Sequence, residues 1–169
     1  MAKNHFALFG LPVAYEIDER ELARRHRELL SACHPDRFAQ ASAQERRLAV
    51  QTSAALNEAV KVLRDPVDRA RYLLALAGVP TDEETDTGMD GAFLVQQMEW
   101  REALEEGRAD PHRLTALGRE WRAATATRHE ALRQCLAGGA DYPQARRLVR
   151  ELQFLRKFGD ELDEAQMDI

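Results

Sequence analysis

The sequence predicts an all-α protein built from two helical units, and three observations lead to this prediction. Apolar residues recur every three to four positions in each long segment, as in amphipathic helices, and no segment sustains the two-residue alternation of a strand. Signals for helix starts and stops punctuate these segments. An acidic segment with two glycines divides them. We therefore predict a first unit at residues 1–80, a linker at residues 81–91 and a second unit at residues 92–169.

A short turn of helix and a first long helix open the predicted fold. Residues 4–10 form the turn, which Gly10 closes. Asp18 then begins the long helix as its N-cap, with Glu21 three residues later in the reciprocal pattern called a capping box. The helix ends at or before His34, because the proline that follows this residue disfavours an α-helical backbone there. Its apolar residues form one stripe, and the opposite side carries a ridge of three arginines, Arg20, Arg24 and Arg27.

A second long helix and a shorter one complete the first unit. Ser42 with Glu45 forms another capping-box pattern, and apolar or small residues spaced three and four apart continue to about Arg64. The loop between the two long helices is short, which makes them antiparallel. Asp65 and the proline after it then start a helix that runs to Ala77.

The second unit is predicted to be a small antiparallel bundle of three helices. The apolar pattern places these helices over residues 92–106, 110–136 and 143–158. Residues 161–169 are rich in carboxylates and are predicted to be a frayed acidic tail.

Charge and composition exclude several functional classes. The net charge of −5 divides into +2 for residues 1–80 and −7 for residues 81–169, which disfavours nucleic-acid binding and favours two different partners. No stretch approaches the roughly 20 apolar residues of a membrane span, and the N-terminus lacks a secretion signal, so we expect a cytoplasmic protein without membrane contact. Cys33 and Cys135 are far apart in sequence and form no zinc-binding pattern, so no metal is expected.

The loop of the predicted hairpin carries the residues with the clearest chemistry, the tripeptide of His34, Pro35 and Asp36. Because proline fixes its backbone φ angle, an imidazole and a carboxylate are held on a stiff turn, and rigid groups lose little entropy on docking. No nucleophile, phosphate-binding loop or metal set accompanies them, so docking is favoured over catalysis. An ordinary capped turn and a small hydrolase that uses His34 and Asp36 remain as alternatives.

In this context the chain resembles the J-domain family over residues 4–77. The likeness rests on the tripeptide, on the Phe-Ala-Leu-Phe-Gly-Leu-Pro segment at residues 6–12 and on the Leu-Arg-Asp-Pro segment at residues 63–66. Cys33 departs from the aromatic residue that the family commonly has before the histidine. The resemblance implies that this unit contacts the ATPase domain of a DnaK-type chaperone through His34, Pro35, Asp36, Arg24, Arg27 and Arg37.

In the second unit, the first predicted helix is apolar on two sides. Phe93, Trp100 and Leu104 fall on one face, which is expected to be the core seam. The other side carries Leu94, Val95 and Met98 beside Glu99 and Glu102, and the last helix places Phe154 opposite its own core face. A small bundle has little material to cover such a face, so partner binding is favoured. Packing under the first unit or a weak homodimer is the alternative.

Residues 92–102 and 152–155 resemble the C-terminal domain of the HscB family, the specialised J-proteins of iron–sulfur cluster assembly, and residues 4–12 are also similar. The resemblance implies an L-shaped adaptor that is not an enzyme and holds no cofactor. Its second unit would bind the scaffold protein IscU, and its J-domain would present IscU to the chaperone HscA and stimulate ATP hydrolysis. A general J-domain co-chaperone for other clients is the alternative. The implied scaffold-binding residues are Leu94, Val95, Met98, Glu99, Glu102 and Phe154.

Overall fold

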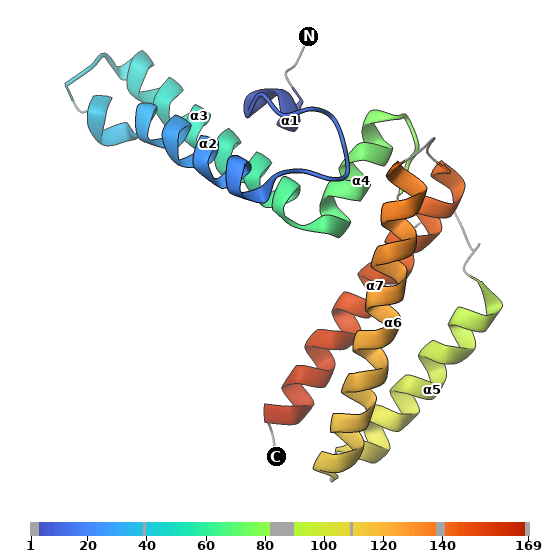
Figure 1. The fold of residues 1–169 in the computed structure, drawn as a ribbon. Helices are drawn as coiled ribbons and strands as arrows, with labels where there is room; N and C mark the ends of the chain where they lie inside the picture. Colours follow the sequence, from blue (N-terminus) through green and yellow to red (C-terminus); the bar gives the residue numbers. More distant parts are fainter. Residues whose placement is uncertain (1–3, 39, 82–89, 109, 138–140, 168–169) are drawn as a thin grey trace. The chain divides into compact units, whose positions relative to one another are not determined.

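The computed structural model describes residues 4–38, 40–81, 90–108, 110–137 and 141–167, and these ranges contain helices and no strand (Figure 1). The predicted all-α class is confirmed. The chain divides into two compact units, Met1–Leu73 and Leu74–Ile169, and the division falls within helix α4 (Pro66–Leu76). Most of the predicted linker, residues 82–89, lies outside the described residues.

Helix starts in the first unit follow the capping signals of the sequence. The Asp18 carboxylate accepts hydrogen bonds from the backbone N–H groups two and three residues later, at 2.9 and 3.0 Å. Ser42 and Glu45 form the complete reciprocal capping box, and the Asp65 carboxylate caps the last helix of the unit in the same way as Asp18. The elements are α1 (His5–Leu8), α2 (Glu19–Ala32), the 3-10 turn η1 (Pro35–Phe38), α3 (Ala43–Arg64) and α4 (Pro66–Leu76).

Helix α1 is tied to the hairpin by an arginine that the sequence pattern did not single out. The Arg25 guanidinium of α2 donates hydrogen bonds to the backbone carbonyls of Phe9 and Gly10, just after α1. Gly10 has a φ angle of +62°, which favours glycine, and a Cβ atom there would lie 2.6 Å from the same guanidinium and displace it. The buried cluster beneath consists of Phe6, Phe9, Leu22, Leu56, Ala59 and Leu63.

The three predicted helices of the second unit are present, but the last one is longer than predicted. The expectation of a frayed tail at residues 161–169 is wrong as far as Met167, because α7 continues to that residue. Leu162 and Ala165 are buried and extend the apolar stripe of Phe158 at spacings of four and three. The carboxylates between them do not prevent helix formation, since they lie on other faces. The elements are α5 (Gly91–Gly107), α6 (Pro111–Ala137) and α7 (Tyr142–Met167).

Helices α6 and α7 approach each other closely at a tryptophan. The Trp121 indole N–H donates a hydrogen bond to the Leu155 carbonyl at 2.8 Å, and the ring lies directly over Gly159. A Cβ atom at Gly159 would overlap the ring. This contact fixes how α6 lies against α7, the two helices on which α5 packs.

Candidate functional site

The hairpin tip, defined here as His34, Pro35 and Asp36, leads into the 3-10 turn η1, and its polar groups are accessible. The His34 and Asp36 side chains are 52% and 90% exposed. The Asp36 backbone N–H donates a hydrogen bond to the His34 Nδ1 atom at 3.3 Å, and the Arg37 N–H donates to the His34 carbonyl at 3.0 Å. Because Nδ1 is used inside the loop, Nε2 of this exposed ring is the nitrogen available for an external contact.

The base of the tip is held to both long helices. The Ser53 hydroxyl of α3 donates a hydrogen bond to the Cys33 carbonyl at 3.2 Å, and the Cys33 thiol lies 3.4 Å from the same hydroxyl. The Arg37 guanidinium donates to the Ser31 carbonyl near the end of α2 at 3.3 Å. Cys33, the residue before His34, is half-buried and makes polar contacts across the hairpin. The J-domain family commonly has an aromatic ring at this position.

In the predicted ridge of Arg20, Arg24 and Arg27, part of the positive charge is neutralised by nearby carboxylates. Arg24 and Arg27 are both exposed, but the Arg24 guanidinium lies between the carboxylates of Glu21 and Glu28, at 2.7 and 2.6 Å. Hydrogen bonds from Arg24 and Arg25 lower the pKa of Glu21 to about 2. The Glu21 carboxylate, which the capping-box pattern assigned to the helix start, thus binds these arginines. The charge of Arg24 is offset locally, which leaves Arg27 and Arg37 as the stronger candidates for steering an acidic partner.

Neither cysteine completes a metal site in the part of the chain that the structure describes, where no group of three His, Cys, Asp or Glu side chains gathers. Both thiols are free, and burial, followed by the nearby Asp141, raises the pKa of the Cys135 thiol. No helix in the described ranges has the length and apolar character needed to cross a membrane. Among the described residues, the hairpin tip thus offers groups for hydrogen bonds and charge contacts, and no cluster of metal-binding side chains lies beside it.

The second candidate surface is the α5 outer face, defined here as Leu94, Val95, Met98, Glu99 and Glu102. The three apolar side chains are 43%, 55% and 72% exposed, and both glutamates are exposed. On the opposite side of the helix the predicted core seam is buried. The seam consists of Phe93, Trp100 and Leu104. The division of α5 into an inner and an outer face therefore follows the helical periodicity, and large apolar groups are left accessible.

Phe154 does not stand free on the outer side of α7, which corrects the expectation from helical periodicity. The ring is half-buried and packs edge-on against Phe93 of α5, with ring centres 5.7 Å apart, and it lies 6.3 Å from the Phe158 ring. The Arg101 guanidinium sits 5.6 Å from its centre. The expectation was wrong because α7 buries contacts with two neighbouring helices over a wide arc, whereas a single core face was assumed. The Phe154 ring therefore lies at the edge of the core, between Phe93 of α5 and Phe158 of α7.

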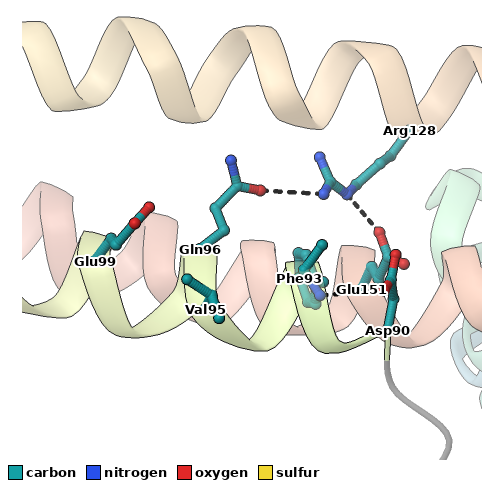
Figure 2. A pocket seen from close by; sticks show the side chains of 8 residues that line it. Asp90, Phe93, Val95, Gln96, Glu99, Arg128 and Glu151 are labelled. Atoms are coloured by element: carbon teal, nitrogen blue, oxygen red, sulfur yellow. Dashed lines mark hydrogen bonds and ion pairs between the residues drawn. The ribbon is translucent and has the colours of Figure 1, made fainter.

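A polar cleft of about 330 Å³ runs beside the outer face, and an arginine from α6 crosses it (Figure 2). The Arg128 Nη2 atom donates a hydrogen bond to the Gln96 side-chain oxygen of α5 at 3.2 Å, and Nε donates to the Glu151 carboxylate of α7 at 2.6 Å. The same guanidinium lies 4.8 Å from the centre of the Phe93 ring. Arg128 lies four residues after Ala124 and four before Leu132 in the apolar spacing of α6, and a charged residue at a core spacing is the sequence signal for such a contact.

Comparison with known protein families identifies the second unit. Residues 89–163 match a family model described as the HSCB C-terminal oligomerisation domain. Over the whole chain, a co-chaperone protein HscB homolog from Bordetella pertussis is 46% identical across 165 residues, which cover 98% of this chain and 97% of that protein. A homolog of the same description from Cupriavidus taiwanensis is 49% identical across 96% of this chain and 93% of that protein.

Solved structures of HscB proteins have the same fold as this chain. Chaperone HscB from Vibrio cholerae superimposes with a TM-score of 0.87 and 36% identity, over 98% of both chains. The human co-chaperone protein HscB gives a TM-score of 0.93 over 99% of this chain and 84% of that one. At 24% identity, the human protein supports the fold alone.

Proposed function

Because the chain belongs to the HscB co-chaperone family, we propose that it acts as a non-enzymatic adaptor in iron–sulfur cluster assembly. It binds the scaffold protein IscU and delivers it to the DnaK-type chaperone HscA, whose ATP hydrolysis it stimulates. The observation that carries the proposal is the presence of two accessible surfaces of different chemistry in one chain, an imidazole–carboxylate tip in the first unit and an apolar face in the second.

The hairpin tip is the proposed contact with the ATPase domain of the chaperone. Asp36 offers a carboxylate and His34 offers Nε2 from a turn that hydrogen bonds hold in shape, so little entropy is lost when they dock. Arg27 and Arg37 add positive charge that favours approach to an acidic surface. Binding of the tip shifts the chaperone toward its hydrolysing conformation, and no bond is made or broken by this protein.

The α5 outer face is the proposed contact with IscU. Leu94, Val95 and Met98 supply apolar area, and Glu99 and Glu102 beside them supply charge that selects a partner with basic groups at its rim. Phe154 supports this surface from the side through Phe93. Holding IscU on one unit and the chaperone on the other raises the effective concentration of the client at the chaperone.

Steady-state ATP hydrolysis by HscA tests the proposal. The rate is measured with this protein alone, with IscU alone and with both together. We expect this protein alone to stimulate hydrolysis, and both together to stimulate it by more than the sum of the separate effects. If adding IscU does not change the stimulated rate of ATP hydrolysis, and IscU does not bind this protein in a defined ratio, the result favours a general J-domain co-chaperone for other clients.

A further inference from the structure

Helix α5 carries large apolar side chains on two faces, and only one of these faces is buried in the bundle. Phe93 and Trp100 point into the bundle, while Val95 and Met98 remain exposed on the other side. Successive residues are about 100° apart around a helix, so a roll of one residue would bring outer residues toward the core. Such a roll would set Leu94 and Arg101 at the places of Phe93 and Trp100, so packing of the seam opposes it, and a polar contact on the same seam adds to that opposition.

The seam of α5 is interrupted by a polar residue at the position where the roll can be prevented. Gln96 is half-buried and lies between Phe93 and Trp100 along the seam. Its side-chain oxygen accepts the hydrogen bond from Arg128 described above. We call the group of Gln96, Arg128 and Glu151 the Arg128 bridge, because it joins α5, α6 and α7 through one guanidinium (Figure 2).

The geometry of the Arg128 bridge depends strongly on the rotation of α5. The guanidinium is fixed from the α6 and α7 side, since it also donates to the Ala124 carbonyl at 3.2 Å and pairs with Glu151. The Arg128 and Glu151 side chains are only 18% and 16% exposed, so breaking the contact leaves polar groups poorly hydrated. A roll of α5 would remove both Gln96 and the Phe93 ring from the guanidinium. Buried polar contacts of this kind specify register in coiled coils at some expense of stability.

The cleft beside the bridge explains why α5 needs such a device. Val95 and Glu99 of the outer face border this space of about 330 Å³, so close packing does not hold that edge of the helix. From these contacts we propose that Arg128 is a positioning residue for partner docking. Through Gln96 and Glu151 it selects the rotation of α5 that presents Leu94, Val95 and Met98. The inference rests on the proposed function for the identity of the partner.

The test replaces the bridge by apolar groups without leaving a buried charge. In the double variant R128M/E151M, both members of the ion pair become methionine, which commonly leaves stability unchanged or raises it. We expect the melting temperature to be retained, amide hydrogen exchange at residues 93–98 of the free protein to become faster, and IscU affinity to fall about tenfold. A purely structural role of Arg128 would not lower affinity at constant stability.

A matched control lies on the same helix. The Arg133–Glu130 pair has the same residue types, but its side chains are 48% and 50% exposed and it lies within α6. The double variant R133M/E130M should leave exchange in α5 and IscU affinity unchanged. If R128M/E151M proves unstable, Arg128→Lys keeps a positive charge near Glu151 but loses the planar fork, and the same two measurements apply to it.

The outcomes separate this inference from the proposed function. Unchanged exchange at residues 93–98 in the R128M/E151M variant overturns the inference, whether or not IscU binds. Faster exchange with unchanged IscU affinity also overturns it, because rotation of α5 then has no part in docking. If the unaltered protein does not bind IscU, the proposed function is rejected, and the exchange measurement alone decides whether the bridge controls α5.

Discussion

The hairpin tip and the α5 outer face are both accessible, but they are held in place by different means. The tip is shaped by bonds between residues close in sequence, such as Asp36 N–H to His34 Nδ1, with Ser53 as a more distant support. The outer face owes its orientation to side chains from two other helices, above all Arg128 and Glu151. A polar tip built locally tolerates changes elsewhere in the fold, whereas an apolar face built from distant contacts depends on the whole bundle.

The largest expected effect separates the two surfaces by function. We expect His34→Gln to abolish stimulation of HscA while leaving IscU binding and the melting temperature unchanged. The imidazole is exposed and its contacts lie within the loop, so its loss removes a docking group and little folding energy. Steady-state ATPase rates measure the loss of stimulation, and a thermal melt measures whether the melting temperature is unchanged. Retained stimulation would show that the tip is not the chaperone contact.

The second expected effect is on the other surface. Changing Leu94 and Met98 together to alanine should weaken IscU binding by about 2–4 kcal/mol, since exposed apolar groups at the centre of an interface contribute most of its energy. The melting temperature should change little, because both side chains are exposed in the free protein. Titration calorimetry with IscU and a thermal melt test this. A large fall in the melting temperature would mean that the outer face is part of the core.

Phe154→Ala sharpens the same comparison, since this ring belongs to both the border of the outer face and the core. Its contacts with Phe93 and Phe158 predict a loss of stability that the Leu94 and Met98 changes do not cause. A Phe154→Leu variant is the control, because it retains most of the buried volume. Loss of IscU affinity in the alanine variant without loss of stability would place Phe154 on the binding surface alone.

A third effect tests whether the bundle and the tip are independent. Gly159→Ala forces a methyl group against the Trp121 ring and should destabilise the protein by about 1–3 kcal/mol. IscU affinity should fall, because α5 packs on the displaced helices. Stimulation of HscA in the absence of IscU should persist at temperatures where the first unit remains folded. The same change at Gly91, where a Cβ atom meets nothing within 4 Å, is the control.

The two surfaces also differ in how far the sequence predicts them. Short-range signals such as Asp18, Ser42 with Glu45 and the proline after His34 placed the hairpin and its tip, because each acts within a few residues. The burial of Phe154 and the role of Arg128 escaped prediction, since both depend on which helices become neighbours. The end of α7 was missed because its acidic composition outweighed a continuing apolar stripe at Leu162 and Ala165. Arg25 was missed because its carbonyl partners lie outside any helix pattern.

The smallest expected effect concerns the charges along α2. The pKa of Glu21 is depressed from 4.5 to about 2 by Arg24 and Arg25, so the folded state binds this proton less readily than the unfolded chain does. A carboxylate of this kind stabilises the fold above pH 4.5, and the stabilisation is lost as the pH falls from 4.5 toward 2. Glu21→Gln should therefore lower the melting temperature slightly at pH 7, and the difference from the unaltered protein should shrink through that pH range.

The size of this difference decides between two roles of the glutamate. The ion pairs are only partly buried and are screened by salt, so a small effect that disappears at high ionic strength is expected. Glu45→Gln at the Ser42 capping box is the matched control, because the pKa of Glu45 is also lowered, by hydrogen bonds from the Ser42 hydroxyl and backbone. A larger, salt-independent loss for Glu21→Gln would mean that Glu21 acts chiefly by holding Arg25 against the Phe9 and Gly10 carbonyls. Each unit would then depend on an arginine that joins segments distant in sequence, Arg25 in the first unit and Arg128 in the second.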